Sequence, residues 1–561
     1  MITFFRNQFF LLSFILIIAL FLRLCQLDTT PTGFLEDEAH IGYNAYSILQ
    51  TGKDKNNDRL SLSVDQFGDF RPSGLHNLVI PSVAFFDLTI FATRFPVALV
   101  GGLSVVIMYF LAFEIFKKRE LALLASAMLA LNPWHISASR ITSESIVALA
   151  LVMLGVWGFL KFIAVPEKKI KKNVLILLLG VIAFIVSFQF YHASRYFVPF
   201  LLSAIILFTV FKKSYTLKQR SLFFLCGVIT AIGLVILFIL SSGQGRVDSV
   251  SIFTHPETQI QSHMQKIEDT NIPSLLVHLF HNPITEYGRT FVTNYGQHFN
   301  SDFLFVTGGY PIRYMIPWQG LFYGIDVLFL VIGVAAIVIA ILSSKERSFL
   351  LFLPLLWTLL GPIPAAFTFE DIPHYQRSIM MLPGLILLAA YGCYYLFASL
   401  SHIRIRQGVI IITALVFTYN FATFLHTYFH HGQTHQTKYR SEGLKELVAA
   451  VGELKDDGRE IIMTSQYSNH VIFYLFYDKI DPDRYQQLGS PRDKNNLEFE
   501  GYTFRDEDCP SYSAGAQVNS GLLSPVYVDL GNCLIPAEIR VIKEILRPDQ
   551  SVAFRILEVK E

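Results

Sequence analysis

Long apolar runs alternate with short polar segments along most of the chain. Each run approaches the length of about 20 apolar residues that crosses the hydrocarbon core of a bilayer. We therefore expect a polytopic α-helical membrane protein with about eleven transmembrane helices. The predicted spans are 8–22, 97–116, 120–134, 144–164, 173–190, 197–211, 221–240, 321–343, 349–367, 378–400 and 408–427.

One further apolar stretch, residues 78–92, has a different character. It contains Pro81 and Asp87, both unfavourable in a lipid-exposed span. Counting it as a span would also invert the orientation of every later helix. We therefore expect an interfacial or re-entrant helix here.

The distribution of lysine and arginine predicts the orientation. Basic residues concentrate in alternate short loops, such as 117–119 and 167–172, and such loops normally face the cytoplasm. This places the N-terminus inside, as a retained first span, and the C-terminus outside. Three large external segments follow, namely 23–96, 241–320 and the tail.

The tail from residue 428 has the composition of a soluble domain. An amphipathic helical stretch leads to a turn at Asp457-Gly458 and then to the strand-like "REIIMT". The segments "SPVYVDLGNC" and "SVAFRILEVK" also read as strands, so a small α/β domain is expected. The predicted domains are thus 1–427 and 428–561. Cys509 and Cys533 could form a disulfide if the tail lies outside the cytoplasm.

Composition agrees with the membrane interpretation. The chain is 52% hydrophobic and only 16% charged, whereas soluble proteins carry about 25% charged residues. The formal net charge is +1 and no basic face is evident. A nucleic-acid partner is therefore not expected.

Candidate chemistry lies at the predicted external ends of the spans. Ionisable residues beside a membrane are often functional, although loops also carry ordinary solvated charges. The external set comprises Asp37, Glu38, His40, Asp69, Arg71, His76, Arg94, Arg140, Glu144, His192, Arg195, His374 and Arg377.

The stretch "GFLEDEAHIGYNA" begins shortly after the first span. Glu36, Asp37 and Glu38 precede apolar residues at helical spacing, so we expect them at a helix N-terminus, where the dipole favours anions. An ionised carboxylate there could act as a general base towards a hydroxyl or amide. The alternative is a solvated acidic turn.

Two arginines invite competing interpretations. Arg71, beside Pro72, suits a phosphate because a guanidinium donates two parallel hydrogen bonds. It could instead reach lipid headgroups. Arg140 and Glu144 are four residues apart, so an intrahelical pair is a structural alternative for them.

Several motifs together resemble a known superfamily. The run "GFLEDEAHIGYNAYSILQTGK…FGDFRPSGL…ATRFPVALVGGL…NPWHISASRI" resembles the GT-C membrane glycosyltransferases. Its branch is similar to bacterial relatives of protein O-mannosyltransferases and lipid A aminoarabinose transferases (glycosyltransferase family 39-like). The resemblance is strong over roughly the first 200 residues and weak through "NYGQHFNSDFLFVTGGYPIR" and "FEDIPHYQRSIMMLPGL".

The resemblance implies roles for particular residues. Asp37-Glu38 stands at the catalytic acidic pair, with Asp37 as the base, and Arg71 stands at the residue that contacts the lipid phosphate. Ser73 replaces the second proline of the family pattern. Arg140 and Arg377 are further candidates for the donor phosphate. Candidates for the substrate pocket are His40, Asp69, His76, Arg94, Glu144, Arg195, His298 and His374.

The implied activity is transfer of a hexose or pentose, mannosyltransferase-like and with inversion, from a polyprenyl-phosphate donor. The acceptor could be a protein, a lipid or a glycan at the outer face of the plasma membrane, among membrane lipids. Some relatives bind a divalent cation, but no ligand cluster in this sequence indicates a metal site.

Two other classes of function are compatible with the sequence. A transporter or flippase for lipid-linked or anionic substrates could use the same arginines. It should carry polar residues and broken helices near mid-membrane, whereas these spans are largely apolar in their middles. An inactive scaffold that presents the tail is the third possibility.

Overall fold

In a computed structural model of the chain, the structure describes residues 2–560 except 60, 67, 164–169, 212–215, 241–249, 255, 270–271, 344–348, 467–469, 492–496 and 517–524. The chain forms two compact units, which we describe separately. The helical unit comprises Met1–Cys25, Val97–Ser139 and Ser143–Thr427. The sheet unit comprises Gln26–Pro96, Arg140–Thr142 and Tyr428–Glu561.

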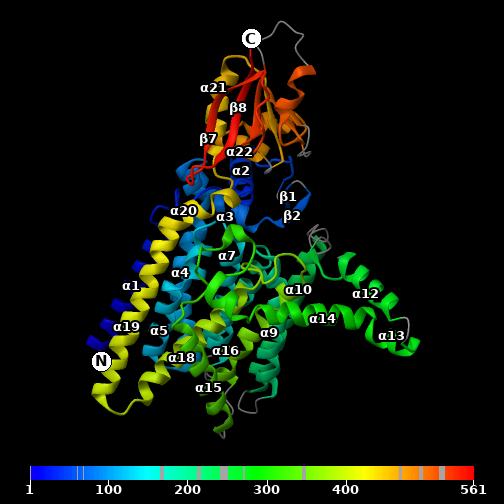
Figure 1. Cartoon of the computed structure of the whole chain (residues 1–561). Coiled ribbons are helices and arrows are strands. Elements are labelled where there is room, and N and C mark those ends of the chain that lie inside the picture. Colours follow the sequence, from blue (N-terminus) through cyan, green and yellow to red (C-terminus); the bar gives the residue numbers. More distant parts are fainter. Residues whose placement is uncertain are drawn as a thin grey trace. The chain divides into compact units, whose positions relative to one another are not determined.

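The helical unit is built mostly from long apolar helices (Figure 1). These are α1 (Ile2–Leu24), α4 (Ile90–Phe116, whose first turns belong to the sheet unit), α5 (Arg119–Leu131), α6 (Pro133–Ser139), α7 (Glu144–Ile163), α8 (Ile170–Ser187), α9 (His192–Phe211), α10 (Leu217–Leu240), α15 (Asp326–Ser343), α16 (Phe349–Leu360), α17 (Ile363–Ala366), α18 (Leu382–Ser399) and α19 (Ile403–His426). Between α10 and α15 lie α12 (Pro256–Glu268), α13 (Ser274–Phe280) and α14 (Pro283–Gln297).

Within the described residues, 7 helices are long and apolar enough to cross a membrane, and the pair α5–α6, bent by 56°, would be an eighth. The predicted spans 8–22, 173–190 and 349–367 correspond to shorter apolar helices. The polytopic helical class is confirmed, while the number eleven and the orientation stay predictions. The ambiguous stretch 78–92 coincides mainly with α3 (Gly74–Phe86), which is separate from α4.

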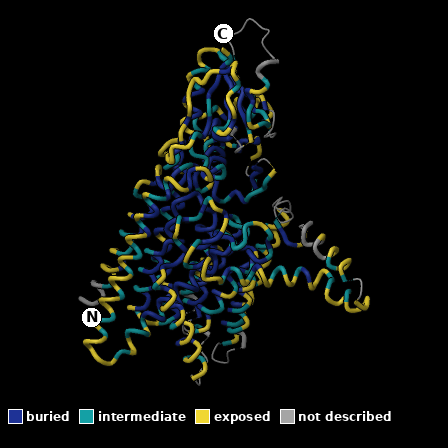
Figure 2. Tube along the Cα trace, viewed as in Figure 1, coloured by how far each residue is buried: buried dark blue, intermediate teal, exposed yellow. Residues whose placement is uncertain are grey.

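Close backbone contacts hold neighbouring helices together. A Cβ at Gly333 of α15 would lie 2.1 Å from the carbonyl oxygen of Leu388, and one at Gly392 of α18 would lie 1.9 Å from that of Phe329. Small residues permit this approach, which is typical of helix packing in membranes. Helices α7 and α18 are buried over most of their length, whereas α10 and α19 are mostly exposed and carry exposed apolar residues; Figure 2 colours the trace by burial. The latter two therefore present lipid-facing surfaces.

The sheet unit joins the loop between α1 and α4 to the tail. The loop supplies α2 (Glu36–Thr51), the antiparallel hairpin β1 (Ser63–Gln66) and β2 (Asp69–Pro72), and α3. The tail supplies α20 (Gly432–His435), α21 (Leu444–Asp456), α22 (His470–Tyr477), α23 (Pro482–Gln487) and a sheet of order β4-β5-β3-β6-β8-β7. The chain enters this unit for the last time at residue 428, while residues 26–96 of the predicted domain 1–427 also belong to it.

The tail sheet is mixed. Its strands are β3 (Ile461–Thr464), β4 (Leu497–Phe499), β5 (Tyr502–Arg505), β6 (Val526–Leu530), β7 (Ile539–Leu546) and β8 (Val552–Val559). Strand β3 is parallel to β5 and β6, and the outer pairs are antiparallel. The predicted α/β character is confirmed, with α21, β3, β6 and β8 at the expected positions.

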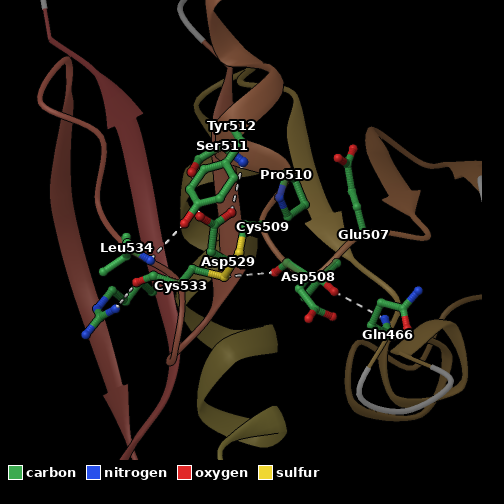
Figure 3. The surroundings of a disulfide bond; sticks show 12 residues. Gln466, Glu507, Asp508, Cys509, Pro510, Ser511, Tyr512, Asp529, Cys533 and Leu534 are labelled. Carbon is green, nitrogen blue, oxygen red and sulfur yellow. Dashed lines mark hydrogen bonds between the residues drawn. A yellow bond between two sulfur atoms is a disulfide. The ribbon is translucent and has the colours of Figure 1, made fainter.

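A disulfide joins Cys509 and Cys533, as the sequence suggested (Figure 3). It links the segment before β6 to the loop after it. Neighbouring hydrogen bonds fix the same region: the Ser511 amide donates to Asp529 at 3.0 Å, and the Leu534 amide donates to the Tyr512 hydroxyl at 2.9 Å.

Candidate active site

The acidic cluster lies in the first turn of α2, as predicted. Glu36, Asp37 and Glu38 are the first three residues of this helix. The Glu38 carboxylate accepts the Leu35 amide at 3.1 Å, which satisfies one of the donors that a helix start leaves open. Successive helical residues are rotated by about 100°, so Asp37 and Glu38 meet different surroundings.

Glu38 is buried in a network of hydrogen bonds. Arg94 donates to its two oxygens at 2.9 and 3.0 Å. The Thr142 amide and hydroxyl donate to the same carboxylate at 2.9 and 3.0 Å. Burial favours a higher pKa, but the charge and hydrogen bonds of Arg94, with the charge of Arg440, outweigh it and lower the pKa of Glu38. Glu38 is therefore an ionised carboxylate, and both of its oxygens accept hydrogen bonds.

Arg94 extends this network to the chain before α2. Its guanidinium donates to the carbonyls of Leu27, Pro31 and Gly33 at 3.2, 3.1 and 2.7 Å. The Glu38–Arg94 pair thus fixes both the entry to α2 and the direction of its first turn.

Asp37 is more exposed to solvent than Glu38. Its carboxylate lies 2.8 Å from Nη2 of Arg71, and its side chain is 25% exposed, against 1% for Glu38. Arg71 also donates from Nε to Asp69 at 3.0 Å. Asp69 and Arg71 are two residues apart on β2, so both side chains point to the same face. The hairpin, which the sequence analysis missed, therefore brings Arg71 to Asp37.

Two buried histidines lie near this pair. His40 Nε2 is 3.7 Å from the Glu36 carboxylate, and His76 Nε2 is 3.2 Å from the Gln66 side-chain amide. Burial lowers the pKa of His40 to about 4 and that of His76 to about 3. Both rings are consequently neutral near pH 7.

Arg140 is also buried in the sheet unit. It donates to the carbonyls of Gln26 and Thr30 at 3.2 and 2.8 Å, and its guanidinium lies 4.9 Å from the centre of the Phe429 ring. Helix α6 ends at Ser139 and α7 begins at Glu144, so the intrahelical Arg140–Glu144 pair is wrong. Glu144, which is buried, belongs to the helical unit.

The helical unit brings together His298, His374 and Arg377. His298 Nδ1 donates to the Asn294 carbonyl at 2.8 Å, so Nε2 accepts the His374 amide at 3.1 Å. Burial lowers the pKa of His298 to about 4, which keeps this tautomer uncharged. His374 Nδ1 in turn accepts the amides of Gln376 and Arg377, both at 3.1 Å. The two imidazoles thus fix the backbone that carries Arg377.

Arg377 lines a pocket of about 380 Å³. Its guanidinium donates to the Thr368 hydroxyl and the Glu370 carbonyl, both at 3.0 Å. The pocket is mainly aromatic and apolar, with a few polar groups; its walls include Tyr191, His192, Tyr196, Phe200, Ser251, Phe253, Phe367 and Thr368. Arg377 and His192 were among the residues predicted from the sequence, whereas the aromatic wall, which comes from distant segments, was not. Arg195 is not among these lining residues and donates to the Phe188 carbonyl at 3.0 Å.

Among the described residues, no group of three or more His, Cys, Asp or Glu side chains could hold a metal ion.

The chain is similar to one protein family over part of its sequence and to several solved structures in its fold. Residues 13–183 match the family described as dolichyl-phosphate-mannose-protein mannosyltransferase. ArnT from Cupriavidus metallidurans superposes with a TM-score of 0.55 at 11% identity, covering 99% of this chain and 98% of ArnT. The chain has a GT-C fold. The resemblance to the GT-C superfamily is therefore confirmed, and the chain is a multi-pass membrane protein.

Two further GT-C structures are similar. ArnT bound to undecaprenyl phosphate gives a TM-score of 0.53 at 11% identity, covering 97% of each chain. The Archaeoglobus fulgidus oligosaccharyltransferase tethered to an acceptor peptide gives 0.52 at 13% identity. That match covers 84% of this chain, which spans only 63% of the oligosaccharyltransferase. No curated protein sequence matches the chain.

Proposed function

We propose that this GT-C protein transfers a sugar from a polyprenyl-phosphate-linked donor to an acceptor at the extracytoplasmic face of the plasma membrane. The family match and the undecaprenyl phosphate bound by ArnT support the donor class. The Asp37–Arg71 pair carries the proposal, because it combines a partly exposed carboxylate with a guanidinium suited to phosphate.

In this mechanism Asp37 accepts the proton of the attacking acceptor hydroxyl or amide. The acceptor atom forms a bond to the anomeric carbon as the bond from that carbon to the phosphate oxygen breaks. The electron pair of the broken bond leaves with polyprenyl phosphate, and a single displacement inverts the anomeric centre. Arg71 stabilises the departing phosphate through its guanidinium, which now pairs with Asp37 and Asp69.

Glu38 serves a different purpose in this proposal. It is an acceptor for Arg94, Thr142 and Leu35, so it holds in place the first turn of α2, which carries the partly exposed Asp37. Arg140 has a comparable supporting role through the carbonyls of Gln26 and Thr30. Of the three arginines predicted at the donor phosphate, Arg71 is the candidate in the sheet unit and Arg377 is a separate candidate in the helical unit.

The pocket at Arg377 supports an amphiphilic substrate. Its aromatic wall suits a prenyl chain, and Arg377, His192 and Thr368 provide hydrogen-bonding groups. The Cys509–Cys533 disulfide supports an extracytoplasmic tail, since disulfides persist in oxidising compartments. Protein, lipid and glycan acceptors all offer suitable nucleophiles.

A donor panel tests the proposal. The purified chain in lipid nanodiscs would be incubated with radiolabelled polyprenyl-phosphate and polyprenyl-pyrophosphate sugars, together with membrane extracts as acceptors. We expect one phosphate-linked donor to be cleaved, with release of polyprenyl phosphate. In parallel proteoliposomes, passage of an intact donor across the membrane without cleavage would contradict the proposal and favour a flippase.

A further inference from the structure

Helices α12, α13 and α14, together called the arm, expose an unusual amount of apolar surface. In α12 the exposed residues Ile260, Met264 and Ile267 recur at positions i, i+4 and i+7, which places them on one helical face. In α13 the side chain of Leu275 is 81% exposed, and Ile284 at the start of α14 is 85% exposed. Figure 2 shows the arm as predominantly exposed. Apolar patches of this kind mark interaction surfaces.

The other face of α12 is polar. Lys266 is exposed and, like Gln265, lies away from the Met264 stripe on a helical projection. An amphipathic helix with such a division suits a boundary between an apolar and an aqueous phase.

Side-chain contacts of His281 connect the helices of the arm. His281 lies 2.8 Å from the Asp269 carboxylate, just after α12, and 3.1 Å from the Glu286 carboxylate of α14. One imidazole thus links the end of α12 with the first turn of α14.

The root of the arm is fixed at the end of a candidate span. The Ile252 amide donates to the Phe367 carbonyl at 3.0 Å, and the Phe369 amide donates to the Val250 carbonyl at 3.1 Å. Asn294 of α14 donates to the Thr368 carbonyl at 2.8 Å. Residues 367–369 directly follow α17, which closes the apolar segment begun by α16, so the arm leaves the bundle where that segment ends.

The helix before the arm in the chain also exposes apolar residues. Helix α10, which precedes it in the chain, exposes Ile232, Ile236 and Ile239 along its length. Figure 1 shows α12 and α14 running across the direction of α9 and α15. A helix that crosses the spans at their ends lies parallel to the membrane plane.

We propose that the arm is an in-plane membrane anchor, whose apolar face enters the interfacial layer of the bilayer beside the outer ends of α10 and α16. The partner is the lipid surface itself, and this inference is independent of the proposed glycosyl transfer. The Met264 stripe, Leu275 and Ile284 contact acyl chains, while Lys266 faces water and headgroups.

Site-directed spin labelling of the full chain in phosphatidylcholine and phosphatidylglycerol nanodiscs tests this placement. Single labels would be introduced by Met264→Cys, Leu275→Cys and Lys266→Cys after replacement of Cys25, Cys226 and Cys393. Ile236→Cys on α10 gives the lipid reference, and Lys543→Cys on β7 gives the water reference. The labels at 264 and 275 provide independent readings should one variant fail to fold.

We expect the labels at 264 and 275 to be relaxed by oxygen and shielded from a water-soluble nickel chelate, as at 236. The label at 266 should respond to nickel several-fold more strongly. Equal nickel access at 264 and 266 would place the arm in water and overturn the anchor. Shielding of 264 and 275 from both reagents would show protein covering the face, such as a second copy, and would also overturn it.

Discussion

Asp37 and Glu38 are neighbours in one helical turn, yet their surroundings differ in almost every respect. Glu38 is buried and receives hydrogen bonds from Arg94, Thr142 and the Leu35 amide. Asp37 is partly exposed and pairs with Arg71, which Asp69 also contacts. Identical charge in adjacent positions can therefore serve two purposes. The buried ion pair organises the loop, and the open pair is suited to meet a substrate.

The first test of this difference between Glu38 and Asp37 removes the buried charge. Glu38→Gln leaves the Arg94 guanidinium without its carboxylate inside the protein, and loss of one partner of a buried pair costs about 3–5 kcal/mol. We expect a large drop in the free energy of unfolding, measured by thermal or denaturant unfolding in nanodiscs. Glu36→Gln, on the same turn and more exposed, should change it by about 0.5 kcal/mol or less. Equal stability of the two variants would contradict the structural role of Glu38.

The second test removes the cation of the open pair. Arg71→Ala deletes charge-assisted hydrogen bonds worth about 1.5–3 kcal/mol, so donor affinity should fall about 10–100-fold. Arg71→Lys should recover part of it, because lysine retains the charge and loses the planar fork. The exposed Arg59 of the same loop provides the control, Arg59→Ala. Donor binding measured by equilibrium titration would argue against a phosphate contact if Arg71→Ala and Arg59→Ala gave the same affinity.

The third test concerns Arg377 in the pocket of the helical unit. Its hydrogen bonds to Thr368 and Glu370 compete with a substrate phosphate, so Arg377→Ala should weaken donor binding by about tenfold or less. The loss should be similar for donors with short and long prenyl chains, since the charge meets the headgroup. Arg289→Ala, at an exposed position of α14, is the matched control. Unchanged binding in Arg377→Ala would remove this pocket from the donor site.

A fourth, smaller effect follows from the buried histidines. Burial lowers the pKa values of His40 and His298 to about 4 and that of His76 to about 3, from an ordinary 6.5. Below pH 6.5 these histidines are protonated in the unfolded chain but stay neutral in the folded chain. The free energy of unfolding therefore falls as the pH drops towards 4. Glu38 does not contribute in the upper part of this range, because its lowered pKa keeps it ionised. We expect the unfolding temperature to fall gradually from pH 6.5 downwards.

His298→Gln provides the corresponding check. The glutamine cannot titrate, so this variant should show a shallower decline of unfolding temperature between pH 6.5 and 4 than the parent chain. An identical decline in both would show that His298 is not a neutral buried group.

Sequence patterns predicted much of this fold. The apolar runs gave the polytopic helical class because membrane spans require continuous hydrophobicity, and the acidic residues before "AHIGYNA" indicated the start of α2. The β1–β2 hairpin was missed because its short strands carry charged residues, Asp65, Asp69 and Arg71, without apolar alternation. Strand β7 was missed for a related reason, since most of its residues are exposed.

The candidate site was less predictable than the fold. The acidic pair and Arg71 were identified from motifs, but nothing local distinguishes Asp37 from Glu38. Their separation depends on Arg94 and Thr142, which are 56 and 104 residues from Glu38 in the chain. The aromatic pocket wall could not be predicted for the same reason, because Tyr196, Phe253 and Phe367 come together only through the packing of distant segments.

The turnover of Asp37→Asn tests the central claim most directly. Asp69→Asn is the matched control, because it removes an equal charge that pairs with the same arginine, from the strand that carries Arg71. We predict that Asp37→Asn lowers the transfer rate by about 10²–10⁴-fold, the usual contribution of a general base, with an unfolding temperature close to that of the parent. Asp69→Asn should lower the rate by about tenfold or less. A transfer rate in Asp37→Asn equal to that of the parent, or of Asp69→Asn, would contradict the assignment of Asp37 as the base.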